Sequence, residues 1–269
     1  MYEESKAEEY WSKRLHETDP LAAVLSFSLP KYFNEAYSKW ELACVLGAVD
    51  GWTGLRVLDV GCGIGRVTVP VAQSGAQVTA VDNSKEMLAA CRASVEAAAL
   101  GDRVSLHQAS ARSLPGKDGE FDVVLCLGVL EHLPPDVRLE AMAEIARVVK
   151  PNGTVLLVAN STSSVFLTRD SHYESDRQEP SGYHVSLIGV DKVRDYFEGK
   201  GFVVESLGSN LFQSLAKHLL KSFLPLEAGQ ATLDSMLQLC AQLDLEFRAK
   251  GDLDRAFADQ FVLRARRSS

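Results

Sequence analysis

Short apolar runs alternate with helical stretches through the middle of the chain, and this alternation restricts the possible folds most strongly. Runs rich in Val and Leu occur at 55–60, 77–81, 103–107, 121–127 and 153–160. The intervening segments favour helices over 66–74, 84–98 and 135–149. Nearly continuous apolar strands separated by helices are typical of a parallel sheet that is covered on both faces. The pattern therefore predicts a doubly wound α/β fold with right-handed crossovers.

The rest of the chain predicts helical additions to this core. A sixth strand is expected at 201–206 after a helix, and a closing strand at 260–264. The expected units are residues 1–54 as a helical N-terminal cap, 55–207 as the core, 208–256 as a helical insertion and 257–269 as the closing strand. The insertion should leave from the edge of the sheet where ligands bind, because the carboxyl ends of parallel strands lie there. We expect it to form a lid or a dimer contact.

Charge and composition exclude several classes of protein. The 269 residues include 28 Lys and Arg against 36 Asp and Glu, a net charge of −8, which argues against a protein that holds nucleic acid by electrostatics alone. No apolar run approaches the ~20 residues of a membrane span, and the acidic N-terminus does not resemble a signal peptide. The five cysteines are scattered and never form C-x-x-C. We expect a cytoplasmic monomer or homodimer.

A glycine-rich loop follows the first predicted strand. Gly61, Gly63 and Gly65 are spaced G-x-G-x-G between this strand and a helix. Glycines at such a place allow a sharp turn and let a ligand approach the backbone. A dinucleotide fingerprint would instead be G-x-G-x-x-G. The loop predicts a ligand site, although a simple tight turn is the alternative.

Two acidic residues reinforce the prediction of a ligand site. Asp59 lies near the end of the first strand, and Asp82 ends the second strand. A carboxylate at the end of the second strand can accept hydrogen bonds from both hydroxyls of a ribose. A helix N-cap or a solvated surface acid is the alternative for Asp82, and a solvated acid is the alternative for Asp59.

Several motifs taken together resemble one known family. They read Leu-Asp-Val-Gly-Cys-Gly-Ile-Gly from residue 58, Val-Asp-Asn-Ser-Lys-Glu-Met from residue 81, Phe-Asp-Val-Val-Leu-Cys from residue 121, Glu-His-Leu from residue 131 and Lys-Pro-Asn-Gly from residue 150. Across about residues 55–160, the chain resembles the class I S-adenosylmethionine-dependent methyltransferases. The resemblance implies a Rossmann-like, mostly parallel sheet of seven strands with the last strand antiparallel. It also implies S-adenosylmethionine as cofactor and S-adenosylhomocysteine as product.

The resemblance also implies roles for individual residues. The backbone from Gly61 to Gly65, including Cys62 and Gly63, would meet the methionine part of the cofactor. Asp59 would help to position its amino group, and Asp82 would bind the ribose hydroxyls. The residues expected near the adenine or elsewhere against the cofactor are Asn83, Met87, Ser110, Ala111 and Leu127.

Ser110 stands where many members of this family have an aspartate. Here the stretch reads Gln-Ala-Ser-Ala-Arg-Ser-Leu-Pro from residue 108. A serine hydroxyl can still hydrogen-bond the adenine amino group, but it lacks the charge of a carboxylate.

Methyl transfer requires positioning above all, with a general base only where the acceptor must lose a proton. His132, Tyr183 and His184 are the candidate catalytic residues, because His132 follows the fourth strand and the other two lie beyond the fifth. Alternatively, His132 orders its loop and His184 is a solvated loop residue. Some family members bind a divalent metal through Glu-x-x-Glu-His. This chain has Gly128 at the first position, so we predict no metal.

The extra segments give a hypothesis about the acceptor. Leu219, Leu220, Phe223 and Leu224 predict an apolar wall over the acceptor side, and aromatic residues of the N-terminal cap could line the same pocket. We therefore expect O- or N-methylation of an apolar or aromatic small molecule, with the 208–256 insertion as an acceptor-side lid. The alternatives are a protein or RNA methyltransferase, a catalytically silent cofactor-binding partner subunit, and a nicotinamide dehydrogenase that the glycine spacing disfavours.

Overall fold

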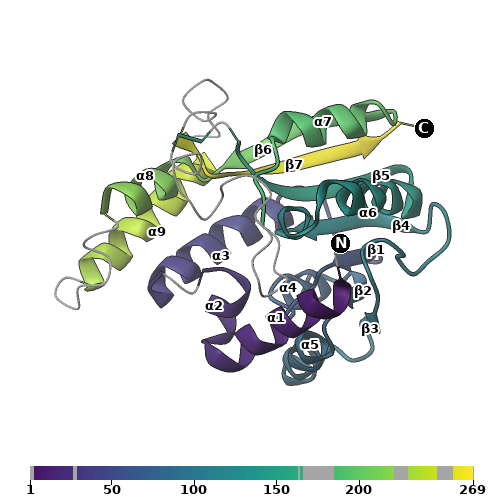
Figure 1. Ribbon diagram of the computed structural model, residues 1–269, viewed down its shortest axis with the longest axis horizontal. Helices are drawn as coiled ribbons and strands as arrows, with labels where there is room; N and C mark the ends of the chain where they lie inside the picture. Colours follow the sequence, from purple (N-terminus) through teal and green to yellow (C-terminus); the bar gives the residue numbers. More distant parts are fainter. Residues whose placement is uncertain are drawn as a thin grey trace.

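The computed structural model is built on one seven-stranded sheet (Figure 1) and describes residues 3–26, 29–162, 164–165, 185–220, 230–246 and 257–268. The strands are β1 (Arg56–Val60), β2 (Gln77–Asp82), β3 (Val104–Gln108), β4 (Phe121–Leu127), β5 (Val149–Asn160), β6 (Phe202–Ser209) and β7 (Gln260–Arg267). Their order is β3-β2-β1-β4-β5-β7-β6. The pairs among β1 to β5 are parallel, whereas β7 runs antiparallel to β5 and β6. The predicted fold class is confirmed.

Helices cover both faces of the sheet, which explains why its strands are apolar along most of their length. On one face, α6 (Pro135–Val148) and α7 (Val190–Glu198) bury side chains such as Ile145 and Phe197. On the other face lie α3 (Lys31–Leu46), α4 (Thr68–Gln73) and α5 (Lys85–Ala97), with Trp40 among the buried side chains. Because each central strand is buried on both sides, almost every residue of it must be apolar.

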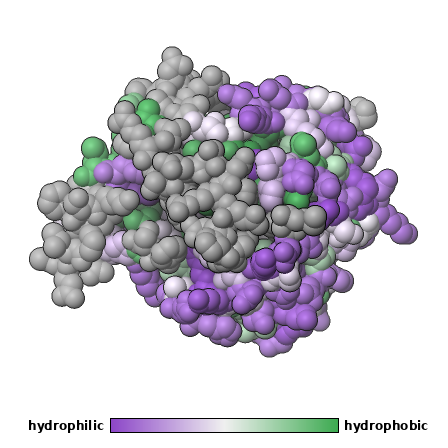
Figure 2. All heavy atoms as spheres, in the orientation of Figure 1, coloured by the Kyte–Doolittle hydropathy of each residue, from purple (hydrophilic) through white to green (hydrophobic). Residues whose placement is uncertain are grey.

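The N-terminal helices and the insertion form a further layer beside the sheet (Figure 1). They are α1 (Glu4–Glu17) and α2 (Pro20–Val24) at the N-terminus, with α8 (Leu211–Leu220) and α9 (Gln230–Glu246) between β6 and β7. Helix α3 contacts both the sheet and this layer. Tyr32 and Phe33 of α3 pack with Ala216 of α8 and Leu237 of α9. Figure 2 shows a mostly hydrophilic surface over α1 and α5. Among the described helices, none is long and apolar enough to cross a membrane.

Local chemistry sets where several elements begin. The Ser84 hydroxyl accepts the Met87 N–H at 3.2 Å and caps α5. Helix α4 begins at Thr68, so Pro70 lies in its first turn, where an N–H has no partner within the helix and its loss costs little. Strand β5 begins at Val149, before the predicted residue 153, because Val149 already pairs with Phe121.

Candidate functional site

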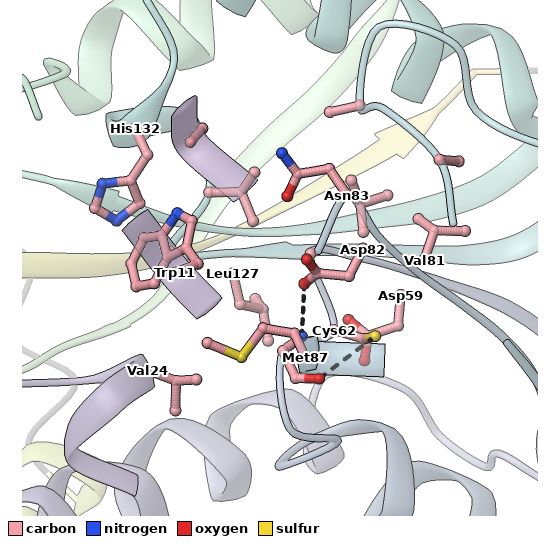
Figure 3. Close-up of a pocket in the computed structure, with 18 of the residues that line it drawn as sticks. Trp11, Val24, Asp59, Cys62, Val81, Asp82, Asn83, Met87, Leu127 and His132 are labelled. Atoms are coloured by element: carbon pink, nitrogen blue, oxygen red, sulfur yellow. Dashed lines mark hydrogen bonds between the residues drawn. The ribbon is translucent and has the colours of Figure 1, made fainter. Parts of the chain in front are cut away.

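A cavity opens at the carboxyl ends of β1, β2 and β4, the edge where ligands of open α/β sheets bind. The space inside it is about 1180 Å³, a value that includes the open solvent at its mouth. The loops after these strands form its floor, and residues of α1 and α2 lie against it from the N-terminal cap. Figure 3 shows Trp11 and His132 toward one side of this pocket and Asp82 and Asn83 toward another.

The loop after β1 requires glycine at each of its three glycine positions. Gly61, Gly63 and Gly65 have φ values of 72°, 53° and 82°, which favour glycine. A Cβ on Gly61 would collide with Val129 Cγ2, and one on Gly65 would lie 2.9 Å from Cys91 Sγ. Gly61 and Gly63 line the cavity, whereas Gly65 does not; it allows α5 to pack closely against the loop.

The Asp82 carboxylate ties the glycine loop to the end of β2. Its Oδ2 accepts the Gly63 N–H at 2.9 Å (Figure 3). Its Oδ1 accepts the Ser84 N–H at 3.0 Å. A carboxylate has about four lone-pair sites, so two backbone bonds leave capacity for ligand hydroxyls. Burial raises the pKa of Asp82, and the backbone N–H donors oppose that rise.

Asp59 lies deeper, beneath the glycine loop. Only 3% of it is exposed, and its Oδ2 accepts the Thr68 hydroxyl at 2.6 Å. Burial raises the pKa of this carboxyl to about 6, although the Thr68 hydrogen bond and nearby Arg66 favour the charged form. Asp59 is therefore mostly ionised at neutral pH and can attract a cationic group in the cavity.

Arg66 is the guanidinium among the cavity residues, and α3 holds it in place. It pairs with the buried Glu41, which also accepts the Tyr37 hydroxyl at 2.9 Å. The carboxylates lining the cavity are those of Glu4, Asp59 and Asp82. Three carboxylates against one guanidinium give the described lining an excess of negative charge, which suits a cationic ligand.

The end of the cavity near β4 carries His132. This residue lies in the short 3₁₀ helix η1 (Leu130–His132), and its ring meets the Trp11 ring edge to face at 5.0 Å between centroids. Trp11 comes from α1, so the N-terminal cap covers the histidine that the sequence predicts as catalytic. Both side chains line the cavity.

The structure brings together most of the residues predicted for the site. Those that line the cavity are Asp59, Gly61, Cys62, Gly63, Asp82, Asn83, Met87, Ser110, Ala111, Leu127 and His132. Gly65 lies on the side of the loop that faces α5, away from the cavity. Tyr183 and His184 lie outside the described residues.

Glu131 carries a buried carboxyl group beside the cavity. The sequence alone did not predict that the pKa of this group is shifted. It is 4% exposed, and its Oε1 accepts the Asn160 amide at 3.4 Å. Its Oε2 has no hydrogen-bond partner within the described part of the chain. Burial raises its pKa to about 7. Gly128 places no side chain beside it, and the described residues contain no cluster of three metal-binding side chains.

The N-terminal cap contributes Glu4, Ala7 and Trp11 of α1 and Val24 of α2 to the cavity. The sequence predicts that aromatic residues of the cap, Trp11 among them, could line the pocket, but it does not indicate Glu4, Ala7 or Val24. They belong to no motif, and only their helical spacing is visible in the sequence. Of the predicted apolar acceptor wall, Leu219 is 71% exposed, and Phe223 and Leu224 lie outside the described residues.

Comparison with known proteins places this site in context. Residues 57–153 match a family model described as a methyltransferase domain. A ubiquinone biosynthesis O-methyltransferase of Azoarcus sp. (strain BH72) is 31% identical over 178 residues, 63% of this chain and 74% of the relative. Another, of Aromatoleum aromaticum, is 39% identical over 106 residues, 39% of this chain and 44% of the relative.

A solved structure agrees over nearly the whole chain. It is the magnesium protoporphyrin IX methyltransferase of Synechocystis PCC 6803 with bound SAH, with a TM-score of 0.61 and 18% identity over 98% of this chain and 95% of that one. At this identity the likeness concerns the fold alone. The chain spans about half the length of the first curated relatives that it matches, at 58%, 44% and 54%.

Proposed function

Because this chain belongs to the class I S-adenosylmethionine-dependent methyltransferases, we propose that it methylates an oxygen or nitrogen atom of a small apolar or aromatic molecule. The observation that carries the proposal is the cavity in which the glycine loop, Asp82 and His132 meet. The side of the cavity near Asp82 would hold the nucleoside of the cofactor. The other side, at the end of β4, would hold the reacting group of the acceptor. The scattered free cysteines support a cytoplasmic location.

The residues of the cavity fit the cofactor. Asp82 offers a carboxylate for ribose hydroxyls, and the strictly required glycines keep side chains out of the space above the loop. Asp59 offers a negative charge near the loop, where the amino group and the sulfonium of the cofactor would find it. The excess of carboxylates in the lining is what an overall cationic cofactor requires.

The bound cofactor supplies an activated methyl group, so the protein's task is mainly to align the acceptor. The floor and cap enclose the reacting end with Val129, Leu133 and Trp11, which limit access by water. His132 lies in this part of the cavity and can take a proton from a hydroxyl or ammonium acceptor. Trp11 restricts the orientation of the imidazole through the edge-to-face contact.

The proposed acceptor class has two supports. The side chains around His132 are apolar or aromatic, which favours an apolar acceptor over a highly charged one. Two of the similar proteins are named ubiquinone biosynthesis O-methyltransferase, which supports oxygen as the methylated atom. We therefore place phenols and hydroquinones with apolar tails first among the candidate acceptors.

The test is a methyl-transfer assay with radiolabelled S-adenosylmethionine and four acceptor panels. The panels are apolar phenols, polar amines, peptides and short RNAs. We expect turnover with phenols or apolar amines and none with the two polymers. Turnover restricted to peptide or RNA would reject the small-molecule proposal, and turnover restricted to polar amines would reject the apolar acceptor.

A further inference from the structure

One face of helix α1 lines the cavity. Glu4, Ala7 and Trp11 all line the cavity, and their spacing of three and four residues places them on the same side of the helix. At a rise of 1.5 Å per residue, Glu4 and Trp11 lie about 10 Å apart along the helix axis. The helix therefore reaches from the part of the cavity near His132 to a distant part near β3.

Two contacts fix α1 in this position. The Ser12 hydroxyl donates to Glu86 Oε2 of α5 at 2.6 Å. Arg14 donates to the carbonyl oxygens of Ala22 and Leu25, both at 3.1 Å, and so ties α1 to α2. The helix is thus anchored both to the core and to the rest of the cap, which gives Glu4 a defined place.

The order of the strands determines which end of the cavity takes the base of the cofactor. On the proposed function, Asp82 at the end of β2 binds the ribose. The glycine loop, which meets the methionine part, follows β1 on one side of β2, and β3 lies on the other side. The base must therefore extend toward the end of β3, where Ala109, Ser110 and Ala111 line the cavity.

Glu4 provides the carboxylate at this end. Its Oε1 accepts the Ser110 hydroxyl at 2.6 Å, and Arg112 Nη1 lies 3.9 Å from the same oxygen. The Ser110 oxygen also accepts the Arg112 N–H at 3.1 Å. Glu4 Oε2 has no hydrogen bond within the described part of the chain. The serine hydroxyl thus already donates to Glu4 and accepts from Arg112, whereas Glu4 Oε2 keeps its full capacity to accept hydrogen bonds.

We propose that Glu4, held by Ser110, recognises the exocyclic amino group of the cofactor's adenine and makes α1 part of the cofactor site. This inference rests on the proposed function. An adenine presents an amino group there, which donates hydrogen bonds, whereas a hypoxanthine presents a carbonyl oxygen. An ionised carboxylate only accepts hydrogen bonds, so at the exocyclic position Glu4 favours the amino group of adenine over the carbonyl oxygen of hypoxanthine.

The experiment compares S-adenosylhomocysteine with S-inosylhomocysteine by calorimetric titration. The two ligands have the same charge and differ at the exocyclic group and at the neighbouring N1, which accepts a hydrogen bond in adenine and donates one in hypoxanthine. Titrations are made with the wild-type chain, with Glu4→Gln, and with Glu9→Gln as a matched control from the exposed side of α1. Circular dichroism checks that both variants remain folded.

We expect the wild-type chain to bind the adenosyl compound at least ~10-fold more tightly than the inosyl compound. A glutamine can turn its amide to donate to a carbonyl oxygen, so Glu4→Gln should reduce this preference about tenfold or more, while Glu9→Gln leaves it unchanged. An unchanged preference in Glu4→Gln overturns the role of Glu4 but leaves the proposed function intact. A wild-type chain that binds neither compound overturns both.

Discussion

At the scale of single residues, Asp82 joins the structure of the site to its proposed chemistry. The same carboxylate accepts two backbone N–H groups and offers its remaining lone pairs to the cavity. Asp82→Ala removes charge-assisted hydrogen bonds worth roughly 1.5–3 kcal/mol, so we expect a ten- to hundredfold loss of affinity for S-adenosylhomocysteine. Titration calorimetry measures this loss. Unchanged affinity would mean that the ribose lies elsewhere.

Gly61 tests whether the loop needs glycine for its shape. Gly61→Ala must place a Cβ against Val129 at a φ of 72°, and we expect a loss of about 1–3 kcal/mol in the free energy of unfolding. Gly101→Ala is the control, because a Cβ there meets nothing within 4 Å. Urea unfolding of the two variants measures the loss in each. Equal stabilities would show that the loop tolerates a side chain.

Glu131 predicts a pH dependence of stability. Its pKa is about 7 in the folded chain, against an ordinary value of 4.5. Between pH 4.5 and pH 7, the folded chain therefore keeps a proton on this carboxyl that the unfolded chain has lost. Stability from this group is therefore present at low pH and falls as the pH rises through this window. Relative to Glu131→Gln, the wild-type chain should lose roughly 2–3 kcal/mol between pH 5 and pH 8.

The measurement for Glu131 is urea unfolding of both proteins at each pH. Glu198→Gln is a suitable control, because Glu198 is an exposed glutamate on α7. This variant removes a carboxyl from an exposed position and so controls for the change from glutamate to glutamine itself. If the Glu131→Gln difference does not change with pH, the Glu131 carboxyl is not protonated in the folded chain.

At the scale of elements, the stability of α1 should depend on Arg14. This side chain donates to the carbonyl oxygens of Ala22, within α2, and of Leu25, just after α2, so Arg14→Ala should loosen α1 over the cavity. We expect the amides of α1 to exchange at least ~10-fold faster and S-adenosylhomocysteine to bind more weakly. Lys13→Ala is the control, since Lys13 is 70% exposed and makes one weak ion pair. Equal exchange in both variants would show that Arg14 does not anchor the helix.

The strands could be predicted from the sequence because their burial on both faces leaves a continuous apolar run. The first strand was expected at 55–60 and observed as Arg56–Val60. The early start of β5 could not be predicted, since it depends on pairing between Val149 and Phe121 rather than on hydrophobicity. Elements whose signal is local were therefore placed well, whereas their ends depend on tertiary pairing.

The same distinction applies to the site. Asp59, Asp82 and the glycines follow consecutive strands, and a parallel sheet must bring such loops to one edge. The contact between Glu4 and Ser110 joins residues 106 positions apart and depends on how the cap packs. No periodicity or motif carries that information. The position of Gly65 behind the loop likewise depends on the approach of Cys91 from α5.

At the scale of the whole molecule, the cap, the glycine loop and the end of β2 should behave as one ligand-stabilised unit. A ligand that binds only the folded chain raises its apparent stability by about 2.7 kcal/mol at 100 times its dissociation constant. The central claim is that the cavity at the ends of β1 and β2 binds the adenosyl cofactor. Stabilisation should therefore be specific to compounds that carry this group.

Thermal unfolding of the full chain with saturating S-adenosylhomocysteine, set against the same chain with NAD, tests this claim most directly. We predict a rise in melting temperature of several degrees with the homocysteine compound and none with NAD. A rise with NAD alone, or no rise with either ligand, would contradict the assignment of the cavity.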